Sequence, residues 1–218
     1  MAKAGKMSED GAERLLKRYG IPFARHIMAK TPEQAIKAAA ALGYPVVMKV
    51  SSPDVIHKTE TGGVVTDVRN EKEVRGFFGS IMANVKKKVP GARIDGILVQ
   101  RMFQGREVII GARRDPQFGP VIMFGLGGVF VEVMKDVSFR LLPADPKEIR
   151  EMVQEIKGYP VLKGVRGQKP VSFSALEKCM LGVARLMVAN KAIQEMDLNP
   201  VMIDEKQAIA VDARIITA

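Results

Sequence analysis

Glu195-Met-Asp-Leu-Asn-Pro-Val-Met-Ile203 is the segment that says most about the fold and the site of this chain. Polar and apolar residues alternate along it, as in a β-strand with one buried face. A second such segment, Ala208-Ile-Ala-Val-Asp-Ala-Arg-Ile215, follows after a polar turn at Glu205-Lys206. Together the two segments predict a terminal β-hairpin.

The register of this hairpin decides which polar side chains meet. An even-length loop centred on Glu205-Lys206 pairs residues whose numbers sum to 411. Asn199 then lies opposite Asp212, and Asp197 opposite Arg214, about 5 Å apart across the strands. An amide oxygen beside a carboxylate suits magnesium, which takes one or two carboxylates together with substrate phosphates. The alternatives are two polar residues on a solvated face, or an odd-length loop that breaks this pairing.

Helices and strands alternate over the rest of the chain. N-cap residues, Pro and Gly mark the helix ends, and short apolar runs mark the strands. We expect helices at about 8–19, 31–43, 70–87, 146–157 and 174–190, and strands at about 24–28, 46–50, 64–68, 96–100, 107–112, 121–124 and 138–142. This order predicts an α/β (α+β) fold of two lobes, 1–92 and 93–218, with a small-molecule cleft between them.

The composition is that of a globular protein of one or two domains, with 218 residues, 47% hydrophobic and 27% charged. A single cysteine, Cys179, excludes an intramolecular disulfide and a multi-cysteine metal site. With no signal peptide after Met1, we expect a reducing, cytoplasmic setting. The longest uncharged stretch, residues 116–131, is too short and too interrupted to span a bilayer.

The net charge of +10 favours a polyanionic partner such as a nucleotide, a coenzyme or an acidic protein face. A solvated lysine-rich surface is the alternative. Only Lys86-Lys87-Lys88 forms a basic run, and no aromatic residues are interleaved with it. The sequence therefore lacks the basic and aromatic pattern typical of nucleic-acid binding.

The polar loop Ser51–Gly63 follows the strand that ends in Lys49. Its hydroxyls, amides and glycine pair, with Lys49, can hold phosphate oxygens, although no Walker A motif occurs in the chain. His57 in this loop is either a covalent catalyst or an inert loop histidine. The other histidine, His26, falls in a predicted strand and is interpreted as structural.

Two further segments are open to more than one interpretation. Gly125-Leu-Gly-Gly128 follows a predicted strand but departs from the dinucleotide Gly-x-Gly-x-x-Gly pattern, so it is either a tight turn or a ligand loop. Gln100-Arg101-Met102 ends a strand at the junction of the lobes, where hinge backbone often meets a base. Asp115-Pro116 is a turn signal, and Cys179 fits a buried helical pattern.

Several of these segments together resemble one family in their order and sequence. They are Tyr44-Pro-Val-Val-Met-Lys49, the loop Ser51–Gly63, Gly111-Ala-Arg-Arg-Asp-Pro-Gln-Phe-Gly-Pro120, Phe124-Gly-Leu-Gly-Gly-Val-Phe-Val-Glu132 and Asp197-Leu-Asn-Pro-Val201. The chain resembles the ATP-grasp (β) subunit of ADP-forming acetyl-CoA/acyl-CoA synthetase, a relative of the succinyl-CoA synthetase β subunit. The resemblance covers essentially the whole chain from about Ser8 and implies an ATP-grasp fold.

The resemblance implies the reaction acyl-CoA + ADP + phosphate ⇌ carboxylate + CoA + ATP. In this family a histidine of a partner α subunit takes the phosphoryl group, and a loop histidine of the ATP-grasp subunit carries it to the nucleotide. That position is His57 here, and succinyl-CoA synthetase lacks it. The other implied roles are nucleotide phosphate contact for Lys49, the adenine hinge for Gln100 and Met102, nucleotide contact for Glu107, magnesium ligation for Asn199 and Asp212, and a loose place in the site for Arg113 and Glu132.

The resemblance also implies partners. A CoA-binding α subunit is expected, in an α2β2 heterotetramer, with Mg2+ and ATP/ADP and with neither nucleic acid nor membrane. The chain ends soon after the hairpin and offers no CoA site, so we expect it to need this subunit for turnover. The rival functions are a stand-alone ATP-grasp carboxylate ligase, a non-catalytic nucleotide-sensing module and a basic nucleic-acid-binding protein.

Overall fold

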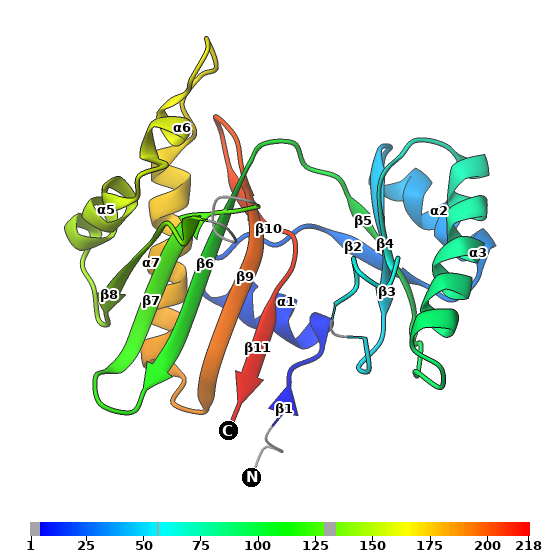
Figure 1. Ribbon diagram of the computed structural model, residues 1–218, viewed down its shortest axis with the longest axis horizontal. Coiled ribbons are helices and arrows are strands. Elements are labelled where there is room, and N and C mark those ends of the chain that lie inside the picture. The colour runs from blue at the N-terminus through cyan, green and yellow to red at the C-terminus, as the bar shows by residue number, and fades with distance from the viewer. Residues whose placement is uncertain (1–4, 56, 129–133) are drawn as a thin grey trace. The chain divides into compact units, whose positions relative to one another are not determined.

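A computed structural model of the protein describes residues 5–55, 57–128 and 134–218. The chain divides into two compact units. The small unit is Ala24–Phe103, and the large unit combines Met1–Phe23 with Gln104–Ala218. Each unit has its own hydrophobic core and its own antiparallel sheet (Figure 1).

The small unit is a four-stranded sheet with two helices. In the sheet order β2-β5-β3-β4, the strands are β2 (His26–Ala29), β5 (Gly96–Arg101), β3 (Val46–Ser51) and β4 (Val64–Val68), and the helices are α2 (Pro32–Leu42) and α3 (Glu71–Lys88). The side chains of Thr31 and Asn70 cap the two helices by accepting bonds from backbone N–H groups. Alternate residues of β3 are buried against these helices, so the intervening residues, Lys49 among them, point to the opposite face.

The large unit is a seven-stranded sheet with four helices among the described residues. Its sheet follows the order β1-β11-β9-β6-β7-β8, and β10 pairs with β9. The strands are β1 (Gly5–Lys6), β6 (Arg106–Asp115), β7 (Gly119–Leu126), β8 (Val137–Leu141), β9 (Ile193–Ile203), β10 (Ala208–Ala210) and β11 (Arg214–Thr217), and the helices are α1 (Glu9–Arg18), α5 (Pro146–Glu155), α6 (Tyr159–Lys163) and α7 (Phe173–Ala189).

Helices α1 and α7 lie on one face of the large sheet, behind the strands in Figure 1. Val108, Ile110 and Ala112 of β6 are buried in the core on this side. Residues between them along the strand therefore point to the other face, which is not covered by these helices. The candidate site residues of the large unit belong to that second face.

Arg114 fastens the end of α7 to the sheet. Its guanidinium donates to the carbonyl oxygens of Asn190 and Ile193 at 2.9 Å each, and also to that of Met187. These are carbonyls at or just past the helix C-terminus, where a cation is favoured by the helix dipole. Arg114 thus fixes the turn from which β9 starts.

The expected α/β (α+β) class is confirmed, and the expected helices and strands occur near their predicted positions. The sequence did not indicate β1 or the short helix α6. The two compact units also differ from the expected lobes 1–92 and 93–218. Strand β5 pairs with both β2 and β3 and so belongs to the small unit, whereas α1 packs its buried face into the core of the large unit.

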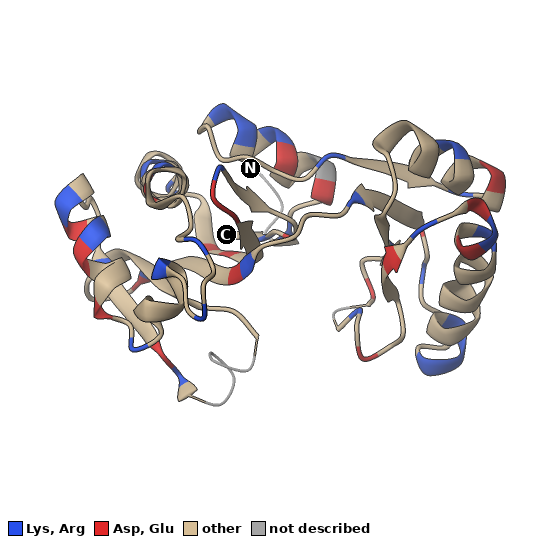
Figure 2. Ribbon diagram, turned by 90° about the horizontal axis from the view of Figure 1, so that it is seen from above, with Lys and Arg blue, Asp and Glu red and all other residues tan. Residues whose placement is uncertain are grey.

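Charged residues of both signs are mixed over the surface of each unit. Figure 2 shows Lys and Arg along the helices of both units with Asp and Glu interspersed among them. The last turn of α3 carries the basic run Lys86, Lys87 and Lys88. Among the residues that the structure describes, no helix is both long and apolar enough to cross a membrane.

Candidate active site

The terminal hairpin has the predicted register. Ala208, Ile209 and Ala210 pair with Ile203, Met202 and Val201, and Arg214 pairs with Asp197, so paired numbers sum to 411 on both sides of the centre. Asn199 and Asp212 occupy the matching positions between these two paired stretches. The predicted pairing of Asp197 with Arg214 is confirmed.

Asp197 and Asn199 share the face of β9 that points away from the core. The residues on either side of Asp197, Met196 and Leu198, are buried at 1% and 0% exposure, so the alternate side chains face outward. Asp197 itself is half-buried, whereas Asn199 is exposed. The hairpin therefore presents a polar group in a partly desolvated position beside an accessible amide.

Burial and neighbouring polar groups together determine the pKa of the Asp197 carboxyl group. Burial raises the pKa of Asp197, and the carboxylates of Glu195 and Asp212 raise it further. The Arg214 guanidinium and a hydrogen bond from the Asn199 side chain oppose that rise in pKa. Because only the amide NH2 of Asn199 can donate to a carboxylate, its carbonyl oxygen is left to accept or to ligate. Asp212 adds a carboxylate, one oxygen of which accepts from the Ala213 N–H at 2.9 Å.

A hollow of about 410 Å3 lies along the same outward face of the large sheet. Its lining comes from four neighbouring strands and is mainly apolar, with three charged side chains. The residues are Gly111, Ala112, Arg113, Val121, Met123, Phe139, Glu195, Met196 and Asp197. Arg113, which the resemblance placed loosely in the site, lines this hollow and pairs with Glu195 across β6 and β9.

Glu107 is exposed at the start of β6, where Gly127 packs directly on it. The Gly127 N–H donates to the Glu107 carbonyl oxygen at 2.7 Å. A Cβ on Gly127 would lie 2.8 Å from the Glu107 Cβ, closer than real atoms approach. Strand β7 continues through Leu126, so Gly127 ends the strand against Glu107, and Gly128 follows with a positive φ of 63°. Glu132, also expected loosely in the site, lies outside the described residues.

His57 lies at the tip of the loop that joins β3 to β4 in the small unit. Its side chain is 72% exposed, and its Nδ1 is 3.7 Å from Oε1 of Glu60. Backbone bonds close the tip, with the Thr61 N–H donating to the His57 carbonyl oxygen and the Gly63 N–H to that of Lys58. The imidazole is therefore accessible on an ordered turn.

The other site residues of the small unit lie on or next to its sheet. Lys49 is half-buried on β3, opposite Leu98 and Val64. Gln100 is only 4% exposed, and its Nε2 donates to the Ala24 carbonyl oxygen at 3.4 Å. Met102 follows the end of β5, half-buried. The buried side chain of Gln100 thus supports the sheet, and the accessible groups are Lys49 and Met102.

His26 and Cys179 fit the structural interpretations. His26 pairs with Gln100 across β2 and β5, and its Nδ1 lies 3.4 Å from the Ala24 carbonyl oxygen. Cys179 is fully buried in α7, and burial raises the pKa of its thiol to about 12. Cys179 is therefore shielded from an external ligand, whereas His26 is half-buried within the sheet of the small unit.

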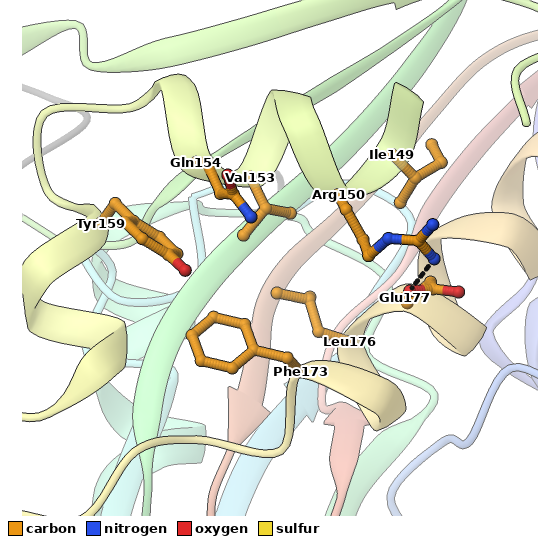
Figure 3. Close-up of a pocket in the computed structure, with 8 residues that line it drawn as sticks. All are labelled: Ile149, Arg150, Val153, Gln154, Tyr159, Phe173, Leu176 and Glu177. Atoms are coloured by element: carbon orange, nitrogen blue, oxygen red, sulfur yellow. Dashed lines mark hydrogen bonds and ion pairs between the residues drawn. The ribbon is translucent and has the colours of Figure 1, made fainter. Parts of the chain in front are cut away.

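A separate groove of about 250 Å3 lies between α5, α6 and α7 and contains none of the predicted site residues. Figure 3 shows Phe173 and Leu176 of α7 facing Val153 of α5, with the Arg150–Glu177 ion pair at one end. The cation in this lining, Arg150, is paired with Glu177 at 3.0 Å. The hairpin face of the large unit and the His57 loop of the small unit therefore remain as two separate candidate sites.

Glu60 is a neighbour of His57 that the sequence analysis did not identify. It lies three positions after His57 in a turn, a spacing that places two side chains on one side. That spacing is visible in the sequence, but it carries information only if the loop forms a turn at this point. The structure shows that the loop does form a turn here, closed by the bond from the Thr61 N–H to the His57 carbonyl oxygen.

Comparison with known proteins decides the family. The model of the ATP-grasp domain family matches residues 2–217. The chain belongs to the ATP-grasp family. It is 48% identical over 209 residues to the β subunit of the ADP-forming acetate–CoA ligase I of Pyrococcus furiosus, covering 95% of this chain and 90% of that protein. The expected ATP-grasp fold and the resemblance to ADP-forming acyl-CoA synthetases are both confirmed.

Two solved structures of one further protein are similar to this chain in sequence and in fold. The acetyl-coenzyme A synthetase 1 of Ca. Korarchaeum cryptofilum, in complex with coenzyme A, Ca-AMPCP and HgCl+, is 46% identical with a TM-score of 0.94, over 98% of this chain and 93% of that chain. A second structure of that enzyme, with coenzyme A and Mg-AMPPCP, is 41% identical with a TM-score of 0.84 over the same shares. In the latter the phosphohistidine segment points towards the nucleotide binding site.

Proposed function

We propose that this chain is the nucleotide-binding component of an ADP-forming acyl-CoA synthetase and that it passes a phosphoryl group between His57 and ADP or ATP. The observation that carries the proposal is the match to a β subunit of this enzyme class along 95% of the chain and 90% of the relative. An exposed histidine on an ordered loop in this chain supports it. The acyl group is expected to react on a partner chain, because the Pyrococcus furiosus relative is named as one subunit of its enzyme.

His57 is the proposed covalent carrier. In the direction of ATP use, an imidazole nitrogen forms a bond to the γ-phosphorus while the bond from that phosphorus to the bridging oxygen of ADP breaks. ADP leaves with the electron pair of the broken bond. In the opposite direction the phosphohistidine gives its phosphoryl group to ADP. The exposure of the side chain lets it meet a nucleotide and a second phosphoryl partner in turn.

Asn199 and Asp212 are the proposed magnesium ligands. The donor set fits a hard cation, because it combines a carboxylate with an amide oxygen, the Asn199 NH2 being engaged by Asp197. Two protein oxygens leave positions for nucleotide phosphates. When bound there, magnesium would supply neutralisation of phosphate charge. The chain's own part is to hold these two oxygens on the paired strands of the hairpin.

Further nucleotide contacts are proposed for Lys49, Glu107, Gln100 and Met102. Lys49 supplies a cation for phosphate oxygens, and Glu107 supplies an exposed carboxylate on β6. Gln100 and Met102 are proposed to form the adenine hinge. Because the Gln100 side chain is buried, we expect its substitution to lower stability as well as nucleotide affinity.

A partner chain is proposed to supply CoA and acyl-group binding. The Pyrococcus furiosus relative is named as subunit β, and we propose an α2β2 assembly for the present protein. The purified chain, assayed alone for ATP formation from acyl-CoA, ADP and phosphate, should give no multiple turnover. Addition of a CoA-binding α subunit should restore it. Sustained turnover by the chain alone would contradict the proposal and favour a stand-alone ligase.

The magnesium assignment has its own test. Asp212→Ala should weaken ATP binding in magnesium by about tenfold or more and have little effect in EDTA, since a lost ligand matters only when the metal is bound. Glu205→Ala is the matched control, because Glu205 lies in the same hairpin and its carboxylate is paired with the exposed Lys169 at 3.1 Å. Equal losses for both variants, or a loss for Asp212→Ala that persists in EDTA, would contradict the assignment.

A further inference from the structure

The turn that carries His57 is closed by its own backbone. The Thr61 N–H donates to the His57 carbonyl oxygen at 3.2 Å, and the Thr61 hydroxyl donates to the Lys58 carbonyl oxygen at 2.8 Å. A bond between residues four apart defines one helical turn, in which residues three apart face the same side. His57 and Glu60 therefore face each other because of the turn. Their side chains approach to 3.7 Å, from imidazole Nδ1 to carboxylate Oε1.

Helix α3 holds this turn in place. Lys88, the last residue of α3, donates from Nζ to the Glu60 carbonyl oxygen at 2.6 Å. Asn84, one turn earlier, packs on Gly62, where a Cβ would lie 2.9 Å from the Asn84 side-chain nitrogen. The backbone of Glu60 is thus anchored to an 18-residue helix. Its carboxylate is presented to His57 from a fixed base, although both side chains remain mostly exposed.

We propose that Glu60 is a positioning residue that accepts the Nδ1 proton of His57 and thereby keeps Nε2 unprotonated for attack on phosphorus. The inference rests on the proposed function, in which His57 carries the phosphoryl group. The hydrogen bond made by one ring nitrogen sets which nitrogen carries the proton. At 3.7 Å, a small rotation of two exposed side chains completes the bond.

In this arrangement, phosphoryl transfer to His57 forms one bond, breaks one bond and moves no proton off the ring. The Nε2 lone pair forms the bond to the γ-phosphorus, the bridging P–O bond breaks, and ADP departs with its electron pair. The Nδ1 proton stays on the ring, which gains positive charge as the N–P bond forms. The Glu60 carboxylate lies beside that charge and favours it. In the reverse step the same proton stays on Nδ1 while ADP takes the phosphoryl group.

The direct measurement is the tautomer of His57 by 15N NMR on the full chain. The chain has only two histidines, so labelled histidine gives two sets of ring signals. We compare the unmodified chain with Glu60→Ala and with Glu71→Gln, a control that removes an exposed carboxylate of α3. Glu60→Gln, which retains a side-chain oxygen, is the conservative variant. Signals of His26 report whether the fold is intact.

We expect His57 to carry its neutral-state proton on Nδ1 in the unmodified chain and in Glu71→Gln, and to shift towards the Nε2–H form in Glu60→Ala, with Glu60→Gln between them. Labelling of His57 from γ-labelled ATP should slow about fivefold in Glu60→Ala, the scale of an exposed ion pair. An unchanged tautomer in Glu60→Ala overturns the inference, even if labelling slows. If the unmodified chain is not labelled on His57, it is the proposed function that fails.

Discussion

Arg114→Met should destabilise the protein far more than the same change at its neighbour Arg113. The Arg114 guanidinium donates to three backbone carbonyls around the end of α7. The Arg113 side chain, in contrast, is 71% exposed and lies 3.8 Å from Asp115. At about 1 kcal/mol for each hydrogen bond lost, Arg114→Met costs about 3 kcal/mol. Arg113→Met should cost less than about 0.5 kcal/mol, as expected of an exposed pair.

The assay is urea unfolding of both variants and the unmodified chain, followed by circular dichroism. Met keeps an unbranched apolar stem, so the comparison isolates the guanidinium. Because Arg114 fixes the turn before β9, its loss should also speed amide exchange at Ile193 and Asn190. A cost below about 1 kcal/mol for Arg114→Met, or equal costs for both variants, would refute the reasoning.

Three further predictions concern stability and reactivity. Cys179 should not react with a thiol reagent at pH 8 in the folded protein and should react once the chain is unfolded, because burial raises the pKa of the thiol to about 12; fast native-state labelling would contradict this. Gly127→Ala should lower the free energy of unfolding by about 1–3 kcal/mol in denaturant titrations, since its Cβ overlaps Glu107, and a neutral result would show that β7 can shift. The Arg140 guanidinium lowers the pKa of Glu155, so Glu155→Gln should lower the free energy of unfolding at pH 7. The loss should shrink as the pH falls below the ordinary pKa of a glutamate, because the native carboxylate then becomes protonated. A loss of stability that grows in acid would contradict this prediction.

Local features of the hairpin were predictable from the sequence. The alternation around Asp197 and the loop centred on Glu205-Lys206 fix the register, because both depend only on residues that are near in sequence. The pairing of Asp197 with Arg214 follows from them. Helix starts at Ser8, Thr31 and Asn70 were equally local, since each cap is a side chain bonding to a backbone N–H three positions on.

Long-range packing was not predictable in the same way. Strand β5 belongs to the small unit because it pairs with β2 and β3, and nothing within residues 96–101 states this. Arg113 and Arg114 cannot be distinguished in the sequence. The position of α7 in the structure shows that Arg114 bonds to the C-terminal end of this helix. Burial of the Gln100 side chain likewise depends on the assembled sheet.

The measurement that tests the central claim most directly is the transfer of label from γ-labelled ATP to the chain in the presence of magnesium, with mapping of the labelled residue. The account predicts a label on His57 that is labile in acid and stable in base, as for a phosphoramidate. His26→Asn should keep this label, and His57→Asn should lose it. Full labelling of His57→Asn, or loss of the label in His26→Asn alone, would contradict the account.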